Sequence, residues 1–161
     1  MLNEKNFSLD IGGRTLTVKF TPLAPQTNGA VLVQYGETTV LVTATMGKTD
    51  RLESSFFPLV VDYEERFYAA GKILGSRFVR REGKPSEGAI LTARLIDRSI
   101  RPLFDQNMRR EVQVVATVLS IDADNDPDFP ALIGTSIALA TSDIPWNGPI
   151  SAIRIGLVNN E

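Results

Sequence analysis

The first 63 residues alternate short β-branched and aromatic runs with glycine-centred turns, a pattern typical of antiparallel strands. The runs cover residues 7–11, 14–20, 30–35, 38–45 and 56–63. Gly12-Gly13 separates the first two runs, and Gly36-Glu37 separates the next two. Because two-residue turns of this kind close β-hairpins, we predict two hairpins followed by a further strand.

Further predictions follow for the polar segment after the second hairpin, for Pro58 and for two later apolar runs. Residues 47–54 are polar and are predicted to be exposed. Pro58 places the strand that contains it at a sheet edge or a bulge, because proline has no N–H to donate. Residues 112–121 are almost continuously apolar, which predicts a central strand covered on both faces. Residues 150–158 predict a last strand.

The longest helical pattern runs from Ser86, a favourable N-cap residue, to Pro102, which ends a helix because it lacks an N–H. Its apolar positions share one side of the helical wheel and are Ala89, Ala93, Ile96 and Ile100. Three arginines fall nearly opposite, and these are Arg94, Arg98 and Arg101. Asp97 is spaced to pair with either Arg94 or Arg101. We therefore predict a helix with one buried face and one arginine stripe.

A second helix is predicted over residues 131–140, where apolar side chains on nearly all sides indicate burial. Asp126 or Asp128 is expected to cap its start. The Gly-Thr-Ser run at residues 134–136 favours close packing over phosphate binding, because it lies inside the buried pattern.

The order of these elements indicates one α+β domain, with a mixed sheet and helices packed on it. A chain of 161 residues is the size of one ordinary domain. Its content of 43% hydrophobic and 22% charged residues is that of a protein with a real core.

Positive charge gathers around the arginine stripe. The whole chain has a net charge of −2, yet Lys72–Arg110 alone holds ten Lys or Arg and four Asp or Glu. A stripe of this kind is often a solvated helix face, but the local excess of cations favours an anion-binding site, since guanidinium forks match phosphates. Tyr63, Phe67 and Tyr68 lie beside this block, where aromatic rings can stack on bases. The alternative is that Phe67 and Tyr68 are core residues.

Several chemistries are excluded by composition. The chain has no cysteine and no histidine, so it offers no disulfide, no thiolate and no Ser-His-Asp mechanism. Gly71-Lys72 lacks the rest of a phosphate-binding P-loop, and the acidic run at residues 122–128 lacks the spacing of an EF-hand. There is no apolar run long enough to span a membrane and no signal-peptide core, so a cytoplasmic location is expected.

Three runs carry a more specific resemblance, and they are residues 63–72 (YEERFYAAGK), 80–87 (RREGKPSE) and 93–104 (ARLIDRSIRPLF). Together they resemble the first ribonuclease PH-type core of the bacterial polynucleotide phosphorylase family, and the similarity covers nearly the whole chain. The resemblance implies an α+β fold of the ribonuclease PH-like type, which is that of ribosomal protein S5 domain 2.

The same resemblance implies a function for the parent protein. Such enzymes degrade RNA from its 3′ end with inorganic phosphate as co-substrate and release nucleoside diphosphates. They use Mg2+, whose site is in a second core. They form a homotrimeric ring around a channel for single-stranded RNA, and no membrane partner is implied.

The RNA-binding residues implied by the family are Phe78, Arg80, Arg81, Arg94, Arg98 and Arg101. In this view Phe78 stacks on a base in the channel constriction, the two loop arginines hold phosphates, and the helix arginines guide RNA to the second core. No catalytic residue and no metal ligand is expected in this chain. The family loop commonly reads Gly-Ser-Phe-Phe-Arg-Arg, whereas this chain has one extra residue and Val79 in place of one phenylalanine.

Residues 1–161 are therefore expected to be a first ribonuclease PH-like domain, truncated at its C-terminal end. The second core, helical linker, KH domain and S1 domain of the family are absent. We expect this RNA-binding and ring-forming part to be inactive alone. One alternative is a non-catalytic RNA-binding module of the same fold, and another is a ribosome-associated or other RNA-binding protein of this architecture.

Overall fold

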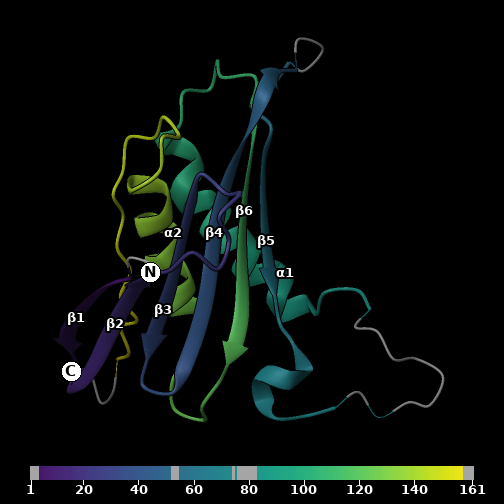
Figure 1. The fold of residues 1–161 in the computed structure, drawn as a ribbon. Coiled ribbons are helices and arrows are strands. Elements are labelled where there is room, and N and C mark those ends of the chain that lie inside the picture. Colours follow the sequence, from purple (N-terminus) through teal and green to yellow (C-terminus); the bar gives the residue numbers. More distant parts are fainter. Residues whose placement is uncertain (1–3, 52–54, 74, 76–82, 158–161) are drawn as a thin grey trace.

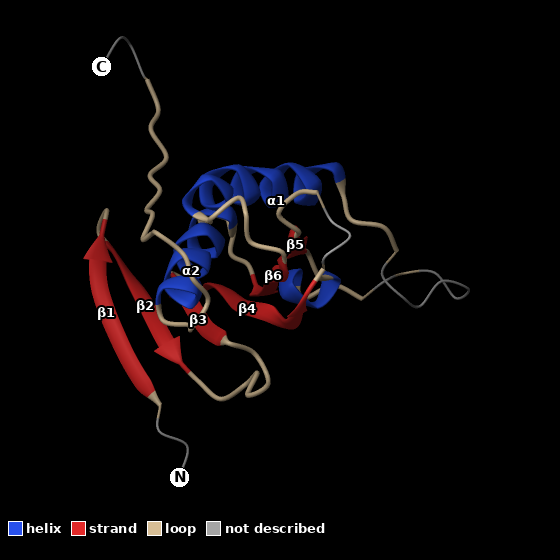
Figure 2. Ribbon diagram, turned by 90° about the horizontal axis from the view of Figure 1, so that it is seen from above, coloured by secondary structure: helices blue, strands red, loops and turns tan. Residues whose placement is uncertain are grey.

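Six strands form one mixed sheet in the computed structural model, which describes residues 4–51, 55–73, 75 and 83–157. Both α-helices lie on the same face of this sheet (Figure 1 and Figure 2). The elements in chain order are β1 (Lys5–Ile11), β2 (Arg14–Phe20), β3 (Gly29–Tyr35), β4 (Thr38–Asp50), β5 (Leu59–Glu64), the 3-10 helix η1 (Phe67–Ala70), α1 (Glu87–Ile100), the 3-10 helix η2 (Arg101–Leu103), β6 (Arg110–Ser120) and α2 (Asp128–Ala140). The predicted α+β architecture is confirmed.

Both predicted hairpins are present. β1 pairs antiparallel with β2, and β3 pairs antiparallel with β4. The turns contain Gly12, Gly13 and Gly36, whose φ angles are 59°, 77° and 61°. Because side chains other than glycine rarely adopt these positive φ angles, the glycines permit the tight turns that set the register of both hairpins.

β5 lies at one edge of the sheet, whose order is β1-β2-β3-β4-β6-β5. It runs parallel to β6, whereas the other strand pairs are antiparallel. Two parallel neighbours need a crossover, and α1 supplies it between β5 and β6. Pro58 immediately precedes β5, and its carbonyl accepts a hydrogen bond from Val112 N at 2.9 Å. The predicted edge position is confirmed.

The core lies between the sheet and the helices. α2 packs on β3 and β4, and α1 packs on β5. Gly134 in α2 allows the closest approach, because a Cβ there would lie 2.7 Å from Val42 Cγ2. Ser136 Oγ accepts a hydrogen bond from Ile150 N at 2.9 Å. The packing role predicted for residues 134–136 is therefore confirmed.

Three local predictions are corrected. β6 is buried on one face only, since both α-helices lie on that side and its alternate residues are partly exposed or exposed. The N-cap position of α2 is Pro127, which provides no side-chain cap, although Asp128 Oδ1 accepts a hydrogen bond from Phe129 N at 2.7 Å in the first turn. Asp126 and Asp128 also bind the guanidinium of Arg154. Residues 150–157 form no strand, since they pair with no neighbour among the described residues. Residues 47–50 are exposed as predicted, but they continue β4.

In the part of the chain that the structure describes, no helix has the length and apolar character needed to cross a bilayer.

Replacing Gly134 by alanine is expected to destabilise the fold. The added Cβ would lie 2.7 Å from Val42 Cγ2 and 3.0 Å from Val33 Cγ2. Overpacking costs about 1–3 kcal/mol, and alanine returns only about 1 kcal/mol through helix propensity. Denaturant unfolding should show a net decrease of about 1 kcal/mol in the free energy of unfolding.

Gly88→Ala is the matched control in the other α-helix. Its Cβ would meet only Ser86 Oγ, at 3.7 Å. This variant should be as stable as the parent protein, or more stable by up to about 1 kcal/mol. Unchanged stability of Gly134→Ala would contradict the close packing of α2 on β3 and β4.

Candidate nucleic-acid interface

The start of α1 is held by a chain of two hydrogen bonds. Ser86 Oγ accepts a hydrogen bond from Ala89 N at 3.0 Å, as an N-cap does. The same hydroxyl donates to Glu65 Oε2 at 2.6 Å. Glu65 follows β5 directly, so the cap also ties the helix to the strand beneath it. The predicted N-cap is confirmed.

The buried face of α1 is the one expected from its periodicity. Ala89, Ile96 and Ile100 are buried and Ala93 is partly buried against the core. The helix ends at Ile100, and Pro102 lies in the 3-10 turn η2 that follows. This orientation turns the opposite face of α1, with its arginines, away from the sheet.

The three arginines of the stripe are not equivalent. Arg94 and Arg98 are exposed, and neither side chain has a hydrogen bond or ion pair with any described residue. Arg101 is partly buried and donates to both carboxylate oxygens of Asp97, from Nε at 2.9 Å and from Nη2 at 2.6 Å. Asp97 therefore pairs with Arg101, which was one of the two predicted partners.

Arg101 also reaches the edge strand. Its Nη1 lies 3.4 Å from the carbonyl oxygen of Phe57, and its Nη2 lies 3.2 Å from that of Leu59. These interactions join the end of α1 to the start of β5. The donors of Arg101 are thus used within the domain, while the donors of Arg94 and Arg98 face solvent.

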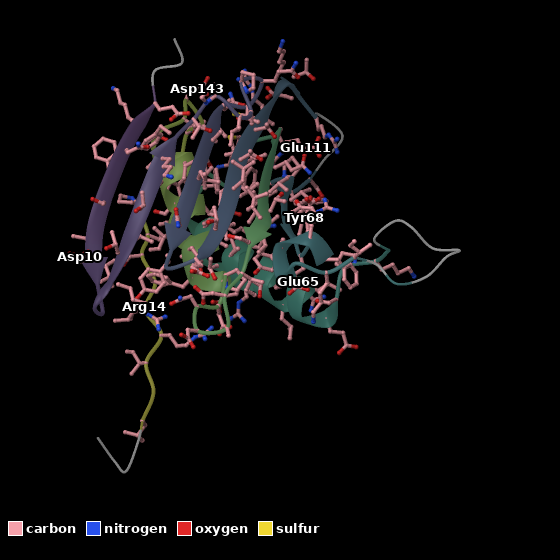
Figure 3. All side chains as sticks on the ribbon, turned by 60° about the horizontal axis from the view of Figure 1, so that its bottom comes forward. Asp10, Arg14, Glu65, Tyr68, Glu111 and Asp143 are labelled. Carbon is pink, nitrogen blue, oxygen red and sulfur yellow. The ribbon has the colours of Figure 1, made fainter. Side chains whose placement is uncertain are left out.

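The aromatic residues before the basic block divide between core and surface. Tyr63 is 5% exposed, whereas Phe67 and Tyr68 on η1 are 46% and 55% exposed. Figure 3 shows Tyr68 and Glu65 on the side of the molecule that carries η1 and α1, away from Asp10 on β1. The core interpretation is wrong for Phe67 and Tyr68, whereas Tyr63 belongs to the core.

The predicted constriction-loop residues lie outside the described residues. These are Phe78, Arg80 and Arg81. Their stacking and phosphate binding stay predictions. Among the candidates that the structure does describe, only Arg94 and Arg98 present unpaired guanidinium groups on α1.

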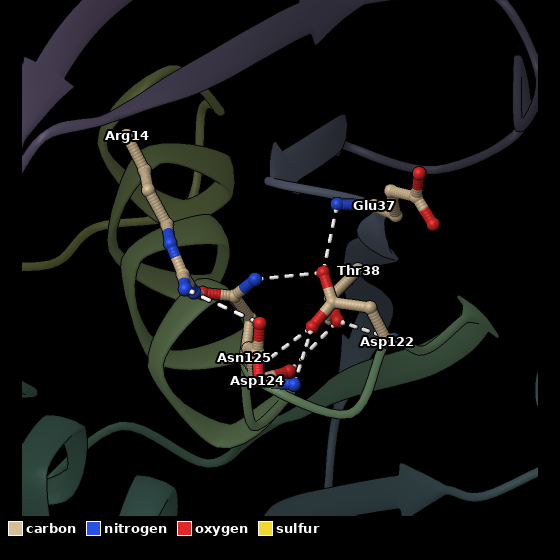
Figure 4. Close-up of polar contacts among 6 residues, drawn as sticks. All are labelled: Arg14, Glu37, Thr38, Asp122, Asp124 and Asn125. Carbon is tan, nitrogen blue, oxygen red and sulfur yellow. Dashed lines mark hydrogen bonds and ion pairs between the residues drawn. The ribbon is translucent and has the colours of Figure 1, made fainter.

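Sequence reasoning missed a polar cluster at the end of the sheet where β6 finishes (Figure 4). The Asp122 carboxylate accepts hydrogen bonds from Glu37 N at 2.9 Å and from Asn125 Nδ2 at 2.7 Å. Together with backbone N–H groups of the same loop, these donors lower the pKa of Asp122 to about 2, the Asn125 side chain being the largest cause. Thr38 Oγ1 donates to the Asn125 carbonyl at 2.7 Å.

This cluster serves the fold. It joins the β3–β4 turn to the loop that leads into α2, and Arg14 of β2 donates to Asn125 Oδ1. In the sequence, Asp122 and Asn125 have the spacing of an ordinary Asx turn. The cluster can be identified only in the folded protein, where these residues contact Glu37 and Thr38. Within the described ranges, no group of three or more acidic side chains is placed to hold a metal ion.

Comparison with known proteins gives a consistent result. A family model described as the 3′ exoribonuclease family, domain 1, matches residues 12–145. The polyribonucleotide nucleotidyltransferase of Ruminiclostridium cellulolyticum is 54% identical over 157 residues, which are 98% of this chain and 22% of that protein. The enzyme of the same name from Shouchella clausii is 57% identical over 96% of this chain and 22% of its own length. The chain thus spans about a fifth of these relatives.

A solved structure supports the fold. An Archaeoglobus fulgidus exosome with RNA bound to its active site superposes with a TM-score of 0.56 at 19% identity, covering 92% of this chain and 59% of that one. With the family match, this confirms the predicted ribonuclease PH-like fold and the resemblance to bacterial polynucleotide phosphorylases.

Replacing Arg101 by alanine is expected to lower stability more than replacing Arg98. The Arg101 variant lacks the bonds to Asp97 and to two carbonyls of the edge strand. We expect the free energy of unfolding, measured by urea titration, to fall by about 1–2 kcal/mol. Arg98→Ala, which removes an exposed and unpaired side chain, should change it by less than about 0.5 kcal/mol. Equal decreases would contradict the division of the stripe into anchoring and solvent-facing arginines.

Proposed function

This chain belongs to the 3′ exoribonuclease family as a first domain, and we propose that it is the RNA-binding core of a longer phosphate-dependent 3′-to-5′ exoribonuclease. The observation that carries the proposal is 54% identity over 98% of the chain to a polyribonucleotide nucleotidyltransferase. Because the chain spans 22% of that relative, the activity is proposed for the parent protein rather than for residues 1–161 alone.

The role of this domain in the proposal is to hold single-stranded RNA. Arg94 and Arg98 project unpaired guanidinium forks from one face of α1, and such forks match phosphate oxygens. Phe78 would stack on a base, and Arg80 and Arg81 would bind the neighbouring phosphates. Arg101 is also on the stripe, but its hydrogen bonds give it a positioning role, because it holds α1 against β5.

The chemistry is assigned to other parts of the parent protein. In the proposed reaction, inorganic phosphate attacks the terminal phosphodiester, the bond to the preceding nucleotide breaks, and a nucleoside diphosphate leaves. The chain has neither histidine nor cysteine for proton transfer or nucleophilic attack. Following the family resemblance, we place the Mg2+ of the parent enzyme in its second core.

The assembly and its location follow the same proposal. Residues 1–161 would be the first core of a cytoplasmic homotrimer, whose parent chain also contains a helical linker, a second core, and KH and S1 domains. RNA would pass through the channel of the ring. A second candidate function is an RNA-binding module that performs no chemistry. It is favoured by the unpaired arginines of α1, together with the absence of a metal-binding acidic cluster among the described residues.

The parent enzyme should release nucleoside diphosphates from single-stranded RNA only when inorganic phosphate is present. The purified 1–161 chain should show no such turnover, because the proposal places the chemistry in other parts of the parent protein and this chain matches only 22% of the relative's length. Chromatography of the products from radiolabelled oligoadenylate measures both. Nucleoside monophosphates from the parent, or turnover by the isolated chain, would contradict the assignment.

Reversing the charge of Arg94 or Arg98 to glutamate should weaken single-stranded RNA binding by the parent enzyme about tenfold or more. The slope of log affinity against log salt should fall by about 0.7 for each phosphate that the variant no longer neutralises. Fluorescence anisotropy across a salt series measures both quantities. Lys5→Glu is the matched control, since Lys5 is an exposed cation on β1, at the other edge of the sheet. Equal affinity of all three variants would leave the stripe as an ordinary solvated face.

A further inference from the structure

A groove runs between α1 and the segment formed by β5 and η1. Two adjoining cavities of about 360 and 450 Å³ make it up. Both cavities are lined by Tyr63, Glu64, Pro85 and Ala89. Pockets for small organic ligands in proteins usually have volumes of about 300–1,000 Å³. The space therefore suits a ligand of the size of one nucleotide. We call it the α1–η1 groove.

The cations of this groove are available, whereas its carboxylates are occupied. The side chains of Lys72 and Lys84 in one cavity and of Arg94 in the other have no partner among the described residues. Each carboxylate already accepts a hydrogen bond from this chain, through the pairs Asp62 with Gln113, Glu64 with Arg66, Glu65 with Ser86, and Asp97 with Arg101. Cations that can still bind a partner therefore lie in both cavities, Lys72 and Lys84 in one and Arg94 in the other.

Tyr63 supplies an unused hydrogen-bond donor in the middle of the groove. The residue is 5% exposed, and its hydroxyl has no hydrogen-bond partner in the described part of the chain. No fully buried oxygen of a described side chain lacks a partner, so this hydroxyl is at least partly exposed, and Tyr63 lines both cavities of the groove. Burial, and then the carboxylates of Glu65, Asp128 and Asp126, raise the pKa of Tyr63, so the hydroxyl stays protonated and can donate.

The walls beside this hydroxyl are flat and apolar. Phe67 is 46% exposed and lines one side, and Pro85 and Ala89 line the other. Nucleobases bind to proteins by stacking on aromatic rings, and every base has an edge acceptor that a hydroxyl can bond. A free polyphosphate that spanned both cavities would instead meet the carboxylate of Glu64, which lines both and repels it.

We propose that the α1–η1 groove binds one nucleotide of an RNA strand, with the base against Phe67 and the Tyr63 hydroxyl and its flanking phosphates at the lysines and at Arg94. The proposal rests on the RNA-binding function proposed above and adds a base subsite to it. Since a hydroxyl accepts any base acceptor, the subsite is expected to hold a base without selecting its identity.

Tyr63→Phe in the parent enzyme tests the subsite, because it removes one oxygen atom. Affinity for a short oligoadenylate should fall about threefold to tenfold, as expected for the removal of one neutral hydrogen bond. Phe67→Leu should lower it about tenfold, because leucine offers no ring for stacking. The melting temperature of Tyr63→Phe should stay unchanged, since the hydroxyl has no partner among the described residues of the free protein.

Tyr68→Phe is the matched control, because it removes the same oxygen from a neighbouring tyrosine that does not line the groove. A series of oligoadenylates, each with one abasic nucleotide at a different position, adds a second measurement. If Tyr63 had only a structural role, its replacement would not change how the affinity depends on the abasic position. The parent enzyme should bind more weakly at one position of the series, and Tyr63→Phe should be less sensitive at that position, because only the contact of the base with Phe67 remains. If the affinity is the same for every abasic position, the proposed subsite is wrong.

Arg98→Glu separates the two proposals, since Arg98 lies on the same helix but does not line the groove. If this variant weakens binding while Tyr63→Phe and Phe67→Leu do not, the subsite is wrong and the RNA-binding function stays supported. If none of the three weakens binding, the RNA-binding role proposed for α1 is wrong, and the subsite is wrong with it.

Discussion

The docking of α1 on the edge strand β5 is the constraint on which the candidate interface depends. Three buried residues, Ala89, Ile96 and Ile100, hold the middle of the helix against the core. One end is tied by the Ser86 cap to the residue that follows β5, and the other by Arg101 to the carbonyls that begin the strand. Because each residue turns a helix by about 100°, a slip of one position would rotate the arginine stripe away from solvent.

The sheet explains why this helix is placed where it is. β5 and β6 are parallel, so the chain must cross from the end of one to the start of the other, and α1 covers the sheet on the way. α2 covers β3 and β4 on the same face, where Gly134 permits close packing. The groove between α1 and η1 exists because the edge strand has a helix over only one part of it. The cations of the groove and the stripe therefore share one side of the domain.

Local features could be predicted because their causes lie within a few residues. The hairpins follow from glycines that adopt positive φ, and the start and end of α1 follow from Ser86 and Pro102. Features that depend on distant neighbours could not. The alternating burial of β6 follows from both helices lying on one face, and Asp126 and Asp128 form ion pairs with Arg154, which is distant in the sequence.

The sequence by itself determined most of the secondary structure, the mixed α+β class, the family resemblance and the concentration of positive charge around α1, since periodicity and composition are properties of the chain alone. Only the tertiary structure decided how each arginine of the stripe is used. Arg94, Arg98 and Arg101 are alike on a helical wheel, but only Arg101 bonds to Asp97 and to the β5 carbonyls. Hydrogen bonding depends on distance and direction in space, and the spacing of residues along one helix does not contain the position of the strand beside it.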